Sequence, residues 1–254
     1  MDQPSLIKDH LRFWKNLGLM GLALAGSLAF LIVRYFLTAQ EYYFFLMWNL
    51  LLAIVPLVLA YFTYLAFGRE PLGKTKKIFI ILLSILWLIF YPNSSYIFTD
   101  FIHLIQRGLP GSGPNSRGLG NMLMWFDMIV KSSFAFSGHI AGLISLFIMH
   151  SLWARIWSPL WGWIMVVLVS IISAYGVFLG RFIRLNSWYL FTQPEDSVKE
   201  VFFNVLADDA ILFSFSFALF IFISYLVVYA FGRQMSHFRH HPELGAQGEN
   251  HETH

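Results

Sequence analysis

The stretch from Ile78 to Gln106, IFIILLSILWLIFYPNSSYIFTDFIHLIQ, decides the expected fold. Its first 14 residues end at Tyr91 and are almost entirely apolar. At about 1.5 Å per residue they cover only ~21 Å of a hydrocarbon core that is ~30 Å thick. Pro92 then removes a backbone hydrogen bond from any helix that continues. Because the residues that follow are still largely apolar, we interpret the whole stretch as one membrane-spanning helix that is broken at Pro92.

Five other apolar runs are long enough to cross a membrane, which takes about 20 residues. They are Leu17–Leu37, Tyr43–Phe67, Asn121–His150, Leu160–Leu179 and Ile211–Phe231. Over the whole chain 57% of the residues are hydrophobic and 12% are charged, whereas soluble domains average roughly 25% charged residues. The sequence therefore predicts an all-α fold, a polytopic transmembrane helical bundle of about six spans within residues 17–232.

The lysine and arginine residues predict how this bundle is oriented. With a cytoplasmic N-terminus, ten of them fall in inside segments and five in outside segments. Cytoplasmic loops carry the excess of these residues, so we expect a cytoplasmic N-terminal segment (residues 1–16) and a disordered cytoplasmic tail (residues 233–254). The net charge of +3 does not indicate a nucleic-acid partner, because the basic residues lie beside apolar runs. The absence of cysteine excludes disulfides and thiol nucleophiles.

A short amphipathic helix is expected between the last two spans, at about residues 195–206. Thr192 and Glu195 have the spacing of a capping box at the start of a helix. An apolar stripe with helical spacing follows at Val198, Val201, Phe202, Val205 and Leu206. This pattern is typical of a helix that lies on the membrane surface, here the outer one.

The half-helix after Pro92 carries a polar stripe. Tyr96, Thr99, Asp100 and His103 are spaced i, i+3, i+4 and i+7, which places them on one face of an α-helix. Polar groups at membrane depth must face protein or water. The stripe either only binds neighbouring helices or lines a functional site. The adjacent break favours a site, because interrupted helices in membranes line cavities.

Two further polar elements are expected on the outer side. Asp127 and Lys131 are one helical turn apart and can pair, although Lys131 can also reach outward on its own. Their face continues as a seam of small residues suited to close helix packing, namely Ala135, Gly138, Gly142 and Ser145.

The sequence GRFIRLNSW at residues 180–188 follows the fifth span. Its arginines, Arg181 and Arg184, are three residues apart and can hold one anion. Alternatively they bind lipid headgroups beside an interfacial Trp188.

The predicted topology brings these elements together into one polar pocket that opens outward. The candidate acid–base residues are Asp100, His103 and Asp127, and the candidate ligand contacts are Asn93, Tyr96, Thr99, Arg181, Arg184 and Asn186. The buried acids need cations nearby, because an unpaired buried charge is strongly destabilising. We therefore expect Asp100, His103, Asp127, Arg181 and Arg184 to form one contact network. No zinc signature of the HExxH type occurs, and no metal site is predicted.

Three motifs of the chain resemble a family of bacterial integral membrane proteins of unknown function. Residues 92–103 are similar to its P-N-x-x-Y-x-x-T-D-x-x-H signature, and residues 125–127 and 180–188 are similar to two others. The family usually has tyrosine at the position of Phe126 and an acid at the position of Tyr189. The resemblance covers roughly residues 45–230. It implies a location in the bacterial inner membrane as a multi-pass protein, and it implies no activity or cofactor.

Three classes of function fit this sequence. The first is a site at the outer leaflet that binds or acts on an anionic, lipid-linked ligand, with membrane lipid as its partner. The second is a small-solute transporter or channel subunit, in which the broken helix binds the solute. The third is a non-catalytic scaffold or accessory subunit whose polar residues only hold helices together. No motif identifies a cofactor or an oligomeric state.

Overall fold

The computed structural model describes residues 3–38, 45–68, 73–101 and 119–240, and all regular structure in these ranges is helical. Within these ranges five helices are long and apolar enough to cross a membrane: Phe45–Phe67, Lys74–Phe101, Met122–Ile156, Pro159–Ile183 and Asp208–Gly232. The apolar part of the first helix, Gly21–Leu37, is shorter. The chain is therefore a multi-pass helical membrane protein, as the sequence predicts.

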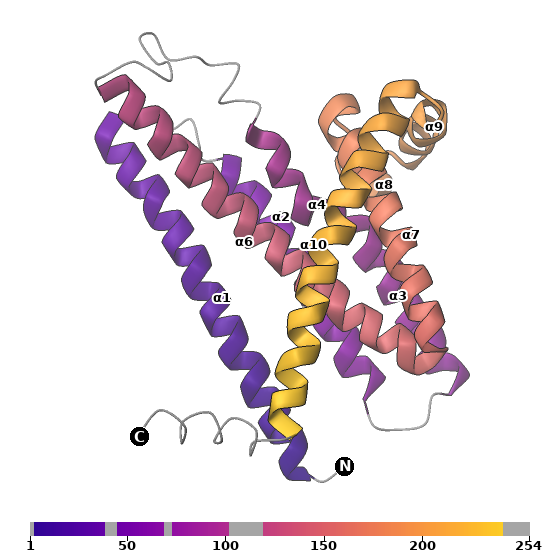
Figure 1. Ribbon diagram of the computed structural model, residues 1–254. Helices are drawn as coiled ribbons and strands as arrows, with labels where there is room; N and C mark the ends of the chain where they lie inside the picture. Colours follow the sequence, from indigo (N-terminus) through magenta and orange to yellow (C-terminus); the bar gives the residue numbers. More distant parts are fainter. Residues whose placement is uncertain (1–2, 39–44, 69–72, 102–118, 241–254) are drawn as a thin grey trace, which may run out of the picture.

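The long helices run side by side in a bundle (Figure 1). They are α1 (Gln3–Thr38), α2 (Phe45–Phe67), α3 (Lys74–Phe90), α6 (Leu119–Ile156), α7 (Pro159–Phe178) and α10 (Asp208–His240). Five short elements join them: α4 (Pro92–Tyr96), the 3₁₀ helix η1 (Ile97–Phe101), the π-helical turn η2 (Leu179–Ile183), α8 (Tyr189–Thr192) and α9 (Pro194–Asn204). Helix α1 begins and α10 ends at the end of the bundle that is opposite α8 and α9 (Figure 1).

Helix α6 is the centre of the bundle, since it contacts α1, α2, α4, η1, α7 and α10. The small-residue seam predicted on α6 makes this possible. A Cβ atom on Gly138 would lie 2.8 Å from Ile97 Cδ1, and one on Gly142 would lie 2.5 Å from Ser94 Cβ. Both distances are too short for carbon atoms, so the close packing of α4 and η1 on α6 depends on these glycines.

The break at Pro92 is confirmed, and its geometry is milder than an unwound segment. Tyr91 keeps right-handed helical backbone angles, and the chain re-enters a helix at once with Pro92 as its first residue. The Ser94 N–H then turns back only three residues, to the Tyr91 carbonyl (3.1 Å). From Ile97 the chain is a 3₁₀ helix, where the sequence analysis expected a regular α-helix. The expected end near Gln106 lies outside the described residues.

The expected surface helix is present as α9, but it begins differently from the prediction. Thr192 ends α8 and donates its hydroxyl to the Trp188 carbonyl, so it does not cap α9. The N-cap is Gln193, whose side chain makes no capping hydrogen bond. The helix starts here because Pro194 occupies the first helical position, which proline favours. The predicted capping box is therefore wrong. The position of α9 on the membrane surface remains a prediction.

Candidate ligand-binding site

The break at Pro92 frees main-chain carbonyls, and side chains supply their donors. Proline has no N–H to complete the helix. Asn93 donates its side-chain amide to the Phe90 carbonyl (2.9 Å), and Ser187 donates its hydroxyl to the Ile89 carbonyl (3.1 Å). Asn93 Nδ2 also donates to Ser187 Oγ (3.0 Å). The segment between α7 and α8 is thereby fastened to the break.

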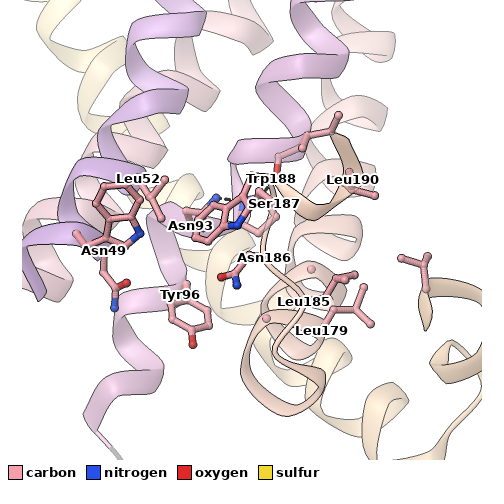
Figure 2. Close-up of a pocket in the computed structure, with 16 residues that line it drawn as sticks. Asn49, Leu52, Asn93, Tyr96, Leu179, Leu185, Asn186, Ser187, Trp188 and Leu190 are labelled. Carbon is pink, nitrogen blue, oxygen red and sulfur yellow. Dashed lines mark hydrogen bonds between the residues drawn. The ribbon is translucent and has the colours of Figure 1, made fainter. Parts of the chain in front are cut away.

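A pocket of about 150 Å³ lies at this junction, between α2, α4 and the segment that follows α7. Its polar lining consists of carboxamides, hydroxyls and indoles, from Asn49, Asn93, Asn186, Tyr96, Ser187, Trp48 and Trp188. Figure 2 shows Asn49 and Tyr96 on one side of the pocket and Leu179 and Leu185 on the other. The structure thus brings the predicted residues Asn93, Tyr96 and Asn186 together.

Two glycines of the lining let the α7 segment approach the broken helix. A Cβ atom on Gly176 would lie 2.7 Å from Pro92 Cγ. One on Gly180 would lie 3.2 Å from the Tyr96 ring. Any larger side chain at position 176 would push the two walls apart, so the shape of the pocket depends on glycine there.

Asp100 lies behind the pocket, not in its lining, and its side chain is only 3% exposed. Its Oδ2 accepts a hydrogen bond from Asn49 Nδ2 (2.9 Å), and its Oδ1 lies 3.5 Å from Arg181 Nη1. Lys131 Nζ donates to the main-chain carbonyl of Asp100 (3.1 Å). The expected contact between Asp100 and Arg181 is therefore present. Asn49 connects the pocket to the buried Asp100, because it lines the pocket and donates a hydrogen bond to the Asp100 carboxylate.

Asp127 has a partner that the sequence analysis did not name. Arg34 of α1 donates from Nε to Oδ1 and from Nη2 to Oδ2 (3.1 Å) of Asp127, which is a bidentate pair. The two side chains are 5% and 4% exposed. Lys131, which was expected to pair with Asp127, donates to the main-chain carbonyl of Asp100. Asp127 of α6 is therefore held by Arg34 of α1, whereas Asp100 of η1 is held by Asn49 and Arg181.

The polar stripe after Pro92 does not form as predicted, because η1 is a 3₁₀ helix. In that helix residues three apart share a face. Ile97 and Asp100 accordingly point into the bundle and are buried, whereas Tyr96 and Thr99 are half-buried. Thr99 donates its hydroxyl to the Tyr96 carbonyl (2.7 Å) and is absent from the pocket lining. Its expected role as a ligand contact therefore has no support in the geometry.

Arg184 does not join the network that the sequence predicts. It ends the π-helical turn η2 in the left-handed conformation, with φ 64°. This conformation costs a non-glycine residue roughly 1–3 kcal/mol. Its side chain is exposed and forms no ion pair with any residue that the structure describes. The left-handed turn at Arg184 redirects the chain after Arg181, so only Arg181 points toward Asp100.

The histidines do not build a metal centre in the described part of the chain. His103 lies outside the described residues, so its expected contact with Asp100 stays a prediction. His139 Nδ1 lies 2.9 Å from Ser95 Oγ, and its ring stacks on Phe220. No group of three or more histidine or acidic side chains suited to a metal occurs among the described residues.

Comparison with known proteins places the chain in a family. The family described as "Protein of unknown function (DUF1361)" matches residues 48–224. The chain belongs to the DUF1361 family. Neither a curated protein nor a solved structure matches it. The DUF1361 range includes every residue of the pocket lining and the Asp100–Arg181 pair, whereas Arg34 precedes it.

Three polar residues of the pocket and of the buried ion pairs were not identified as site residues from the sequence. Arg34 was given no role, although a charge within an apolar run at membrane depth needs a partner. Asn49 lies among apolar residues in the first two turns of α2, and the same argument applies to its carboxamide. Ser187 was quoted as part of a motif without a role. Single polar residues in apolar runs are the signal that would have found Arg34 and Asn49.

Proposed function

We propose that this DUF1361 protein binds the headgroup of an anionic, membrane-associated ligand in the pocket beside the broken helix. One observation carries the proposal: polar side chains gather in a cavity within an apolar bundle, and several keep hydrogen-bonding groups unused. Tyr96 and Asn186 make no side-chain hydrogen bond to any described residue, although both line the pocket. Polar groups that only held helices together would be paired.

Arg184 is the group best placed to receive the anionic part of the ligand. Arg181 is already held against Asp100 (3.5 Å), so its charge is offset inside the protein. Arg184 is exposed and directly precedes Leu185 and Asn186 of the pocket lining. An exposed guanidinium one residue from the lining suits a phosphate or carboxylate.

Binding has more support than acid–base catalysis. The described carboxylates of the candidate set, Asp100 and Asp127, are buried and held by Asn49, Arg181 and Arg34. Neither lines the pocket. A general acid or base must reach the reacting group directly or through one water. Asn49 stands between the pocket and the nearer carboxylate.

We also propose how the protein is oriented and in which membrane it lies. In the orientation that the lysine and arginine residues favour, both termini are cytoplasmic and the pocket opens toward the outer leaflet. The common end at which α1 begins and α10 ends supports an even number of crossings (Figure 1). The family resemblance supports the inner membrane of a bacterium.

The test is retention of phosphatidylglycerol by the full chain in phosphatidylcholine nanodiscs, measured by native mass spectrometry. Arg184→Asn removes the charge and keeps a residue that tolerates the left-handed conformation. Arg155→Asn is the matched control, since Arg155 is exposed at the far end of α6. We expect Arg184→Asn to weaken retention by up to about fivefold, because an exposed ion pair contributes ~0.2–1 kcal/mol. Equal retention in both variants would refute the role of Arg184.

A further inference from the structure

The chemistry of the pocket lining also indicates which part of the ligand enters it. We infer that this part is an uncharged, hydroxyl-bearing ring, such as a sugar or cyclitol unit, carried on a lipid. The inference rests on the proposed function, because it takes the pocket as a headgroup site. It names the chemical class of the ligand group that enters the pocket, whereas the proposed role of Arg184 is to bind the anionic group that stays outside.

The lining is neutral and rich in carboxamides. Its residues include three asparagines and no lysine, arginine, aspartate or glutamate. A phosphate inside the pocket would lack a cation, and an ammonium group would lack an anion, so burying either one would be unfavourable. Carboxamides offer both donors and acceptors, as ligand hydroxyls do. A neutral polyol is therefore the class of group that this lining solvates best.

The unused hydrogen-bonding groups are spread around the pocket. Asn93 uses its amide N–H groups on Phe90 and Ser187, which leaves its Oδ1 as an acceptor. Asn49 likewise donates to Asp100 and keeps its Oδ1. Tyr96 contributes a hydroxyl and Asn186 a whole carboxamide, and the two side chains lie near each other in Figure 2. A ring with several hydroxyls can pair with these groups at once.

Aromatic groups at the pocket supply the complementary apolar contact. The rings of Trp48 and Trp188 meet edge to face, with centroids 6.2 Å apart and planes inclined at 73°. Both residues line the pocket. The C–H faces of a sugar ring are apolar and pack against such indole faces, while each indole N–H remains a donor.

The volume sets the size of the group that enters. Pockets for drug-sized ligands hold roughly 300–1,000 Å³, whereas this one is about 150 Å³. It therefore suits a single ring, not an oligosaccharide. The acyl chains of the carrier would remain in the surrounding membrane.

The experiment compares lipids in phosphatidylcholine nanodiscs, which avoid sugar-based detergents, with native mass spectrometry of the full chain as the readout. The probes are a monoglucosyl diacylglycerol, phosphatidylinositol, phosphatidylglycerol and, in solution, methyl glucoside. We expect the glucosyl lipid and phosphatidylinositol to be retained several-fold better than phosphatidylglycerol. Methyl glucoside should bind weakly, because it lacks the lipid part. Binding of methyl glucoside as tight as that of the glucosyl lipid would overturn the lipid-linked part of the inference.

Two variants distinguish binding of the ring in the pocket from binding of the phosphate by Arg184. Asn186→Ala removes a carboxamide with no hydrogen bond inside the described protein, so it should leave the fold intact and weaken both ring-bearing lipids about two- to tenfold. Asn204→Ala on α9, outside the lining, is the control and should change neither. Arg184→Asn should weaken the two phosphate-bearing lipids, phosphatidylinositol and phosphatidylglycerol, and leave the uncharged glucosyl lipid unchanged.

Each other outcome has one meaning. Retention of phosphatidylglycerol above both ring-bearing lipids, sensitive to Arg184→Asn, would refute the ring and leave the proposed function standing. Preference for phosphatidylcholine over all added lipids would indicate that an ammonium group binds beside Trp48 and Trp188. It would also refute the ring. Retention of none of the lipids would refute both proposals.

Discussion

Replacing Arg34 with methionine is the sharpest test of the buried charge clusters. The substitution keeps most of the side-chain length and removes the guanidinium that holds both Asp127 oxygens. Both partners lie inside the bundle, with side chains 5% and 4% exposed. Asp127 would then keep its charge in an apolar environment without its bidentate partner. Lys131, one turn away on α6, remains in every variant of the test.

The structure sets the expected size of the effect. Removing one partner of a buried ion pair destabilises a protein by about 3–5 kcal/mol, because the other charge is left unpaired. Removing both charges is often neutral. We therefore expect Arg34→Met alone to lower the free energy of unfolding by about 3 kcal/mol or more, and the double variant with Asp127→Asn to recover most of this loss. Such a loss changes the unfolding equilibrium by roughly 150-fold.

The assay is a double-mutant cycle, with unfolding by sodium dodecyl sulfate in mixed micelles followed by circular dichroism. The wild type, the two single variants and the double variant give the coupling free energy between Arg34 and Asp127. Arg184→Met is the control, since it removes an exposed arginine and should cost less than about 0.5 kcal/mol. Losses that simply add, within about 0.5 kcal/mol, would mean that the two side chains are not coupled and would refute the pair.

Two other predictions concern packing and topology. Gly142→Ala should destabilise the bundle by about 1–3 kcal/mol, because its Cβ would lie 2.5 Å from Ser94 Cβ, whereas Gly21→Ala, with nothing within 4 Å, should be neutral or stabilising by up to about 1 kcal/mol. Thermal unfolding in detergent measures both, and equal effects would contradict the close packing of α4 on α6. For topology, Ser112→Cys in this cysteine-free chain should react with an impermeant maleimide in intact cells, while Ser236→Cys should react only after permeabilisation; the reverse pattern would invert the orientation.

Features that depend on composition and spacing could be predicted from the sequence. The length of the apolar runs predicts the helices of the bundle, and proline at position 92 predicts the break, because both follow from local geometry. The small-residue seam on α6 follows from helical spacing alone. A contact between Asp100 and an arginine after the fifth span was expected, because an acid at membrane depth needs a cation. The choice of Arg181 over Arg184 came only from the structure.

Features that depend on tertiary contacts could not be predicted in this way. Arg34 and Asp127 are 93 positions apart, and one sequence contains no information about which buried charges meet. The change to a 3₁₀ helix at Ile97 has no local signal, because the apolar pattern fits an α-helix equally well. The left-handed turn at Arg184 was missed for the same reason, since glycine or asparagine would normally mark it.

The buried charges are best understood as supports for the pocket, not as parts of it. Asn49 donates to Asp100, which Arg181 also contacts, so one carboxylate joins the wall formed by α2 to the wall formed after α7. Lys131 holds the main chain of the same residue against α6. A charge at this depth is costly unless several partners hold it, and the partners here come from both sides of the cavity. Loss of Asp100 should therefore change the distance between the pocket walls, and ligand binding would weaken as a result of that change.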